Sequence, residues 1–331
     1  MKTQYKKLPL ALLLSSLIPG VASAEAQLFG KANLSIASLD DDNGSSRAIS
    51  SHSSRFGIEG DIASKGSLEI AYRLVWQIDM SDEAKASNDH IKSREQYISL
   101  KDSWGEVRLG RHDTPYKKAG KKSVEFFSDS YADWNNIITK THDKRADSSL
   151  SYYKTLDNIN LSGMYAAGND TTTGDNAGEI ISLAADMKFG DLVFAAAYQD
   201  IAEIPDPVPA NVVPSTNAVK FVVGYTLGGT SVGVAMERID EDGAPNATNT
   251  MVSIKHKLND ANTIKFTLGD AESTAPGLND PTMMALGIDH KLNESATVFA
   301  YWADGSDGGL NADAGLVGDS TVLAAGVIVK F

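Results

Sequence analysis

The sequence predicts an all-β chain that folds as a 16-stranded antiparallel transmembrane β-barrel. Apolar and polar residues alternate along most of the 331 residues, which is the period of a β-strand with two unlike faces. The connections between these segments are alternately short and long, as in a membrane barrel whose two ends differ. One long polar segment, 113–148, has no repeating pattern of its own, and we expect it to fold into the lumen.

The N-terminus is expected to lie outside the fold. Three lysines precede a short apolar run, and the small residues at 22–24 form a cleavage site. This order is typical of a secretory signal peptide, which is removed during export. The sequence therefore predicts a signal peptide at 1–24 and a β-barrel at 25–331.

Composition excludes several classes of protein. The net charge is -13, and removal of 1–24 takes away three lysines and no acids, which makes it -16. Such acidity argues against a nucleic-acid binder. Cysteine is absent, so disulfides and thiolate metal sites are excluded, and the six histidines show no metal-binding spacing. Beyond the signal peptide, no apolar run reaches the roughly 18 residues of a membrane helix. We expect no cofactor, no metal and no catalytic residues.

The alternation defines each strand in order. From Leu28 to Ile36, every second residue is apolar or small. In the next strand, Phe56 and Ile58 lie on one face, and the charged residues Arg55 and Glu59 lie on the other. The later strands repeat the pattern at 68–78, 150–152, 159–165, 181–187, 192–198, 219–225, 232–236, 252–258, 264–268, 286–292 and 298–302. The last segment, 323–331, ends on an aromatic residue, and in lipid it must close on the first strand to pair its backbone.

The connections are expected to differ between the two ends of the barrel. Short turns are predicted near Lys65, Ser103, Leu156, Gly190, Gly229, Asp260 and Glu294. Long loops are predicted at 39–52, 80–92, 113–148, 168–178, 201–217, 240–248, 270–281 and 303–319.

The two faces of the strands indicate which side meets lipid. The face with the apolar residues is expected to point outward, because the opposite face is often charged. A dry core would not accept so many charges, so the lumen is predicted to hold water. The expected inward charges are Lys31, Arg55, Glu59, Arg73, Asp186, Lys220, Lys255, Lys265 and Lys291.

Four short segments resemble a known family in their order along the chain. They are Ser-Arg-Phe-Gly-Ile-Glu-Gly at 54–60, Trp-Gly-Glu-Val-Arg-Leu-Gly-Arg at 104–111, Asp-Thr-Pro-Tyr at 113–116 and the terminal Phe331. The chain resembles a Gram-negative general porin of the trimeric, 16-stranded type. The resemblance implies passive diffusion of ions and small hydrophilic solutes across the bacterial outer membrane. It also implies short periplasmic turns, long external loops, a homotrimer, and contact with outer-membrane lipid and lipopolysaccharide.

The resemblance further implies a constriction formed by the third external loop and a basic wall. The acids of this loop would be Glu125, Asp129 and Asp133. The facing arginines would be Arg55, Arg94 and Arg145, with Arg111 and Arg73 as further members. This sequence departs from the Pro-Glu-Phe-Gly-Gly pattern of the family at 124–129, so the resemblance does not predict the detailed bend of the loop.

Two of these arginines break the alternation. Arg111 has the parity of outward-facing Leu109, and it can face the lumen only if a bulge intervenes or the strand ends at Gly110. Arg94 likewise shares parity with Ile98. The constriction is therefore predicted most directly for Arg55.

Ion selectivity and specificity remain open at this stage. The overall acidity favours cations and the lysines of the long loop favour anions, and on balance weak cation selectivity is expected. The alternatives are a solute-specific channel, a barrel enzyme such as a lipase, and an adhesin. The sequence favours a channel that is not an enzyme.

Overall fold

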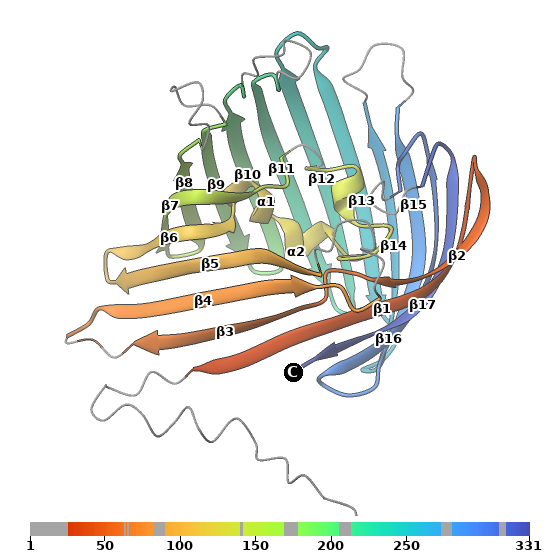
Figure 1. Cartoon of the computed structure of the whole chain (residues 1–331), viewed down its shortest axis with the longest axis horizontal. Helices are drawn as coiled ribbons and strands as arrows, with labels where there is room; N and C mark the ends of the chain where they lie inside the picture. The colour runs from red at the N-terminus through yellow and green to blue at the C-terminus, as the bar shows by residue number, and fades with distance from the viewer. Residues whose placement is uncertain are drawn as a thin grey trace, which may run out of the picture.

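The computed structural model describes residues 26–62, 64, 66–81, 90–139, 142–168, 178–204, 213–272, 280–310 and 316–331; the predicted signal peptide therefore lies outside the described residues. Strand β1 (Gln27–Asp41) pairs with β17 (Ser320–Lys330), and Phe331 exchanges backbone hydrogen bonds with Gly30. The sheet thereby closes into an antiparallel barrel, as predicted (Figure 1). Among the described residues, no helix has the length and apolarity needed to cross a membrane.

Seventeen strand segments form sixteen barrel strands. Strands β2 (Gly44–Ser51) and β3 (Arg55–Ile62) are successive parts of one strand, because both pair with the same side of β1. The remaining strands are β4 (Glu69–Ile78), β5 (Ile91–Asp102), β6 (Gly105–Asp113), β7 (Arg145–Leu156), β8 (Ile159–Ala166), β9 (Ile180–Phe189), β10 (Leu192–Ile201), β11 (Thr216–Leu227), β12 (Thr230–Glu241), β13 (Ala247–Lys257), β14 (Asn262–Ala271), β15 (Thr282–Lys291) and β16 (Ala296–Ser306).

The two barrel ends differ, with one exception to the predicted pattern. At one end, β5 and β6, β7 and β8, and β9 and β10 are each joined by two residues. The long loop predicted at 39–52 is wrong, because β1 and β2 continue into a tight hairpin that turns before Gly44. Serines occur on both faces of β2, so its sequence lacks the alternation of apolar and polar residues that predicts a strand. The predicted loops at 80–92, 168–178, 201–217, 270–281 and 303–319 lie partly outside the described residues.

The outward face of the barrel is apolar. Leu28 and Ile36 of β1 are exposed, whereas Asn33 and Ser35 between them are buried, which confirms the predicted orientation. Exposed apolar side chains of this kind occur around the barrel, for example Leu109, Phe221, Leu268, Leu286 and Leu323. Water would not favour such a surface, whereas a lipid bilayer does.

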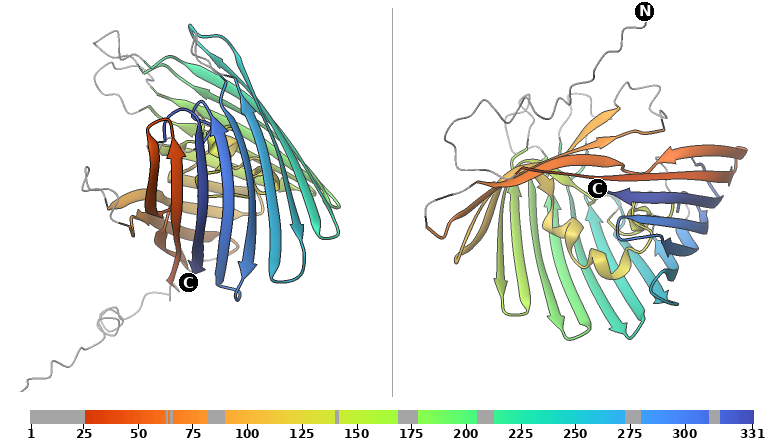
Figure 2. Two further views of the ribbon diagram at one scale, coloured as in Figure 1. Left: turned by 90° about the vertical axis from the view of Figure 1, so that its right-hand side faces the viewer. Right: turned by 90° about the horizontal axis from the view of Figure 1, so that it is seen from below.

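The connection between β6 and β7, residues 114–144, is called the inserted loop below. It contains α1 (Pro115–Lys118), α2 (Lys121–Val124) and the 3-10 turn Trp134–Asn136. Thr114 caps α1 by accepting the backbone N–H of Lys117, and the proline that follows suits the first helical position. Both helices lie inside the ring of strands (Figures 1 and 2).

The main apolar core lies inside the barrel, between the inserted loop and one wall. Tyr116, Val124 and Trp134 of the loop are buried against small inward side chains of β9–β17. Two glycines, Gly224 of β11 and Gly233 of β12, face each other in register below α2. A Cβ atom added to Gly224 would lie 2.5 Å from the Ser123 side chain, and one added to Gly233 would lie 1.9 Å from its carbonyl oxygen. Because these two glycines have no side chains, α2 lies directly on the wall.

Candidate functional site

The inserted loop leaves an open space on the side of the lumen formed by β2–β7. This space, called the upper cavity, has a volume of about 1250 Å³. Nine basic and five acidic side chains line it, a formal excess of four positive charges. The basic residues are Arg55, Arg94, Arg111, Lys117, Lys118, Lys121, Lys122, Lys144 and Arg145, and the acidic residues are Asp113, Glu125, Asp129, Asp133 and Asp143.

Asp129 is the acid of the loop that reaches the basic wall. Its carboxylate lies 2.6 Å from Lys31 Nζ and 3.3 Å from Arg55 Nη1. Its carbonyl oxygen accepts a hydrogen bond from Asn33 Nδ2 at 2.8 Å. Burial alone would raise the pKa of Asp129, but Lys31 and Arg55 outweigh it and hold this pKa well below its usual range. Asp129 of the loop thus contacts Arg55 of the wall directly, and Asp129 is ionised.

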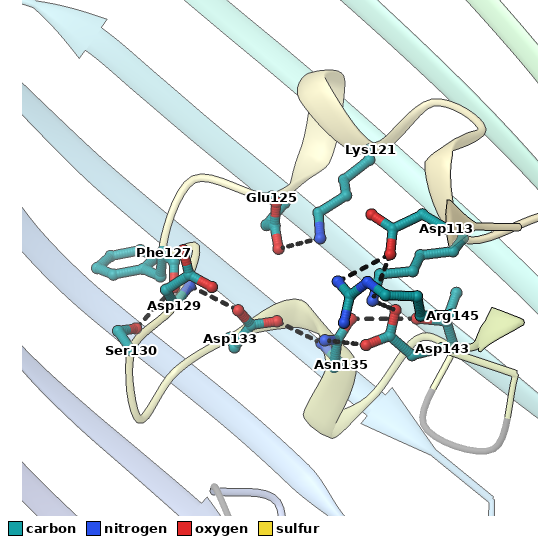
Figure 3. Close-up of polar contacts among 12 residues, drawn as sticks. Asp113, Lys121, Glu125, Phe127, Asp129, Ser130, Asp133, Asn135, Asp143 and Arg145 are labelled. Carbon is teal, nitrogen blue, oxygen red and sulfur yellow. Dashed lines mark hydrogen bonds and ion pairs between the residues drawn. The ribbon is translucent and has the colours of Figure 1, made fainter. Parts of the chain in front are cut away.

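Asp133 orders the bend of the loop. Its carboxylate accepts the backbone N–H of Asp129 at 2.7 Å and that of Asn135 at 3.0 Å (Figure 3). Asp129 adopts a left-handed backbone conformation, with φ of 51°, which this hydrogen bond supports. Burial raises the pKa of Asp133 above its ordinary value. Asp133 thus lines the cavity and also fixes the acid beside it.

Glu125 is a largely buried acid of the upper cavity. Only 7% of its side chain is exposed, and its Oε1 lies 2.9 Å from Lys121 Nζ (Figure 3). Burial, followed by the neighbouring charge of Asp133, raises the pKa of Glu125 to about 8, although Lys121 opposes this shift. At neutral pH this carboxyl group is therefore mostly protonated and adds little negative charge to the cavity.

The basic wall comes from β3, β5, β6 and β7. Arg145 lies 2.9 Å from Asp113, and Lys117 lies 2.8 Å from Asp143. Arg111 pairs with Asp147 at 2.5 Å. Arg94 donates to Gln77 Oε1 at 2.5 Å and has no carboxylate partner among the described residues.

Two β-bulges lie beside Arg94 and Arg111, the first on β5 itself and the second on β7 opposite Arg111. The β4–β5 register shifts between Leu74 and Trp76, which leaves Arg94 and its neighbour opposite a single residue. The β6–β7 register shifts between Gly110 and His112, beside Arg111. Bulges of this kind re-aim a side chain locally while the strand continues. Arg94 lines the lumen although Ile98 faces outward, because the bulge lies between them.

Arg73 lies apart from the other four arginines. It lines a second cavity of about 660 Å³, called the lower cavity, on the inner faces of β3–β6. There Arg73 pairs with Glu59 and, at 2.9 Å, with Glu95, and its guanidinium lies over the Phe29 ring. The structure thus groups Arg55, Arg94, Arg111 and Arg145 with the three loop acids and separates Arg73 from them.

The sequence also missed a buried pair that anchors the inserted loop. Lys220 of β11 was expected to face water, but it is fully buried and donates to the Tyr116 carbonyl at 2.6 Å. Its register partner Glu237 accepts the Tyr116 hydroxyl at 2.6 Å, the Thr139 backbone N–H at 2.9 Å and Asn249 Nδ2 at 2.9 Å. These contacts connect both ends of the inserted loop to a single place on the wall. Alternation alone cannot distinguish such a pair from hydrated charges.

Several lysines of the cavity were recognised only as loop charges. Lys117 and Lys118 lie in α1, and Lys121 and Lys122 lie in α2. Their occurrence within six residues of the sequence was the available signal for a basic segment of the loop.

Comparison with solved structures identifies the same architecture. An anion-selective porin from Comamonas acidovorans superposes with a TM-score of 0.75 at 18% identity, over 93% of this chain and 100% of that chain. OmpF of Salmonella typhi, solved with daunomycin, gives a TM-score of 0.72 at 13% identity, over 92% and 97%. OmpT of Vibrio cholerae gives 0.68 at 17% identity, over 96% and 100%. At these identities the likeness establishes the fold.

The sequence comparison identifies the family. No curated protein sequence matches the chain. The family model described as Gram-negative porin matches residues 10–309, which is most of the sequence. Together with the closed barrel and the inserted loop, this match shows that the chain belongs to the Gram-negative porin family.

Proposed function

We propose that the protein is a general diffusion porin whose pore prefers anions to cations. As a Gram-negative porin, it forms an outer-membrane channel for solutes, and the proposal concerns its selectivity. The upper cavity carries the argument, because basic side chains outnumber acidic ones there by nine to five. Patches of charge in a narrow aqueous pore select ions by sign.

The location of each charge decides between the two selectivities. The sequence predicted weak cation selectivity from a net charge of -13. Charges separated by more than about 10 Å are largely screened at 0.1 M salt, so acids on distant loops count for little. Asp129 is engaged by Lys31 and Arg55, and Glu125 is mostly protonated, so the acids of the upper cavity contribute less than their number suggests. The similar porin from Comamonas acidovorans is described as anion-selective, which is consistent with this proposal.

The assembly and export of the protein follow the family. We propose a homotrimer that contacts outer-membrane lipid and lipopolysaccharide, and an OmpT structure among the similar proteins is described as a trimer form. The export proposal is that residues 1–24 are a signal peptide and that 25–331 form the mature barrel. We propose no enzymatic activity.

The test is the zero-current potential of the purified protein in a planar bilayer under a KCl gradient. We expect conductance steps in groups of three and a potential with the sign of anion selectivity. The double variant Asp129→Asn with Glu125→Gln should shift the potential further toward anions, because it removes acids from the cavity. The matched control, Asp260→Asn with Glu294→Gln, replaces the same two residue types in two short turns and should leave the potential unchanged.

Each result has a distinct meaning. A cation-selective potential would overturn the proposed selectivity and leave the pore intact. An unchanged potential in the first double variant would remove the loop acids from the selectivity site. Folded protein without conductance would overturn the channel itself.

A further inference from the structure

We propose that Lys118 is the residue that maintains anion preference between the upper and lower cavities. This inference rests on the proposed anion-preferring pore and assigns part of that preference to one side chain. Among the described residues, Lys118 alone lines both cavities. A solute that moves from one cavity to the other therefore passes it.

The local structure holds Lys118 toward the open lumen. Its helix α1 is fixed to the wall, because the Tyr116 backbone N–H donates to Ser182 Oγ at 3.0 Å. Gly120 is likewise fixed, because its N–H donates to Asp186 at 3.0 Å. Between Thr114 and Lys121, Lys118 is exposed, and all the remaining residues are buried or partly buried. Its side chain is therefore presented to water by a rigid turn of backbone.

The other cations of the lower cavity are neutralised by acids. Arg73 pairs with Glu59 and Glu95, as described above. Arg108 pairs with Glu106 at 2.6 Å and lies over the Tyr97 and Tyr153 rings. Lys118, by contrast, lies within 4 Å of no carboxylate among the described residues, and Asp186 acts on it only at longer range. Opposite charges in contact largely cancel each other's field at a distance, whereas the field of an unpaired ammonium extends further.

The same contrast holds on the side of Lys118 that faces the upper cavity. Its neighbour Lys117 is engaged by Asp143 at 2.8 Å and by Asp113 at 3.4 Å. Lys118 is thus an unpaired cation at the boundary between an upper cavity with excess positive charge and a lower cavity whose bases are paired. The solutes it would favour are small anions, including chloride and carboxylate- or phosphate-bearing metabolites.

The test compares Lys118→Gln and Lys118→Glu with the wild type in planar bilayers at roughly 10 mM KCl. A unit charge about 10 Å from the ion path changes the anion-to-cation permeability ratio about threefold at this salt, and two units change it about eightfold. We expect Lys118→Gln to lower the ratio about threefold and Lys118→Glu about eightfold. At roughly 1 M KCl both effects should disappear, because the Debye length falls to about 3 Å.

Two further variants separate the role of this position from a change in fold. Lys118→Arg keeps the charge and should retain the wild-type ratio. Lys122→Gln removes a lysine that lines only the upper cavity, away from the boundary between the two cavities, and should have the smaller effect. A wild-type ratio in Lys118→Gln, or an equal loss in Lys122→Gln, would overturn the assignment while the anion-preferring pore stands. A cation-selective wild type would instead overturn the proposed function on which the assignment rests.

Discussion

The two sides of the lumen are built from strands with the same alternation, but one side is packed and the other is open. On the packed side, formed by β9–β17, the inward residues are mostly small or apolar, and the inserted loop lies directly on them. On the open side, formed by β2–β7, inward arginines line the upper cavity. The size and charge of the inward residues, rather than the strand pattern, decide where the loop rests and where solutes pass.

The two sides also use charge differently. On the packed side Lys220 and Glu237 are completely buried, so each depends on hydrogen bonds from the inserted loop. Removing one partner of a buried pair leaves an uncompensated charge and is strongly destabilising. On the open side the ion pairs keep some contact with water, as in the 13–29% exposed side chains of Lys31, Asp129 and Arg55, and hydration weakens the contribution of such pairs to stability. Stability is therefore concentrated on one side and selectivity on the other.

The largest expected effect comes from breaking the buried pair. In Glu237→Ala, the Tyr116 hydroxyl and Thr139 N–H lose their acceptor, and buried Lys220 loses the neighbouring negative charge. We expect a loss of about 3–5 kcal/mol in the free energy of unfolding. The measurement is urea unfolding of the refolded barrel in detergent micelles, followed by tryptophan fluorescence.

A double variant tests the reason for this loss. Glu237→Leu with Lys220→Met removes both charges and should recover the part of the loss that comes from an uncompensated buried charge. The part that comes from the Tyr116 hydroxyl and the Thr139 N–H should remain, because these donors still lack an acceptor. Asp289→Ala, which removes the partner of partly exposed Lys265, serves as the control and should cost less than about 1 kcal/mol. If Glu237→Ala were as stable as the wild type, the inserted loop would be held by apolar packing alone.

A smaller effect is expected when the wall under α2 is filled. In Gly233→Val, the new side chain would occupy the position of the Ser123 carbonyl and displace α2 toward the open side. Overpacking of this kind costs about 1–3 kcal/mol. Because the displaced loop narrows the upper cavity, we expect lower single-channel conductance as well.

The adjacent residue provides the control for this variant. Val234 points outward from the same strand and is 44% exposed, so Val234→Leu should leave both stability and conductance unchanged. If Gly233→Val conducts like the wild type, α2 does not lie as close to the wall as the structure places it.

The difference between the two sides also explains what the sequence could predict. Alternation with period two predicted the barrel and the outward position of Leu28 and Ile36, because one residue type dominates the outer face. The resemblance to general porins led to Arg55 and Asp129, and the structure pairs them. Lys220 was misplaced in water because parity gives the direction of a side chain and not what packs over it.

Two other features depend on information that is not local in sequence. Strand β2 was predicted as a loop, since serines on both faces hide its periodicity, and only its pairing with β1 reveals it. Arg94 reaches the lumen through a bulge that is defined by the register of the neighbouring strand. The unpaired state of Lys118 likewise depends on where all the acids of the lumen lie.

The smallest expected effect sharpens the comparison, because it concerns a buried acid at the edge of the open side. Glu125 has a pKa raised to about 8, mainly by burial, and it faces Lys121, Asp133 and Asp129. It is protonated at pH 6 and ionised at pH 9, so raising the pH adds one negative charge to the cavity. The folded-state pKa exceeds the ordinary value of 4.5, so the stability that Glu125 contributes is fully present below pH 4.5 and declines as pH rises through about 8.

We therefore expect the anion-to-cation permeability ratio to fall by up to about threefold between pH 6 and pH 9 at roughly 10 mM KCl. In Glu125→Gln the side chain cannot ionise, so the ratio should stay near its pH 6 value across this range. Asp129→Asn is the informative contrast, because Lys31 and Arg55 keep Asp129 ionised at both pH values. That variant should shift the ratio toward anions at pH 6 and pH 9 alike and leave the slope with pH intact. Equal slopes in the wild type and Glu125→Gln would mean that Glu125 is already ionised at pH 6. The edge of the open side at Glu125 would then be as well hydrated as the rest of that side.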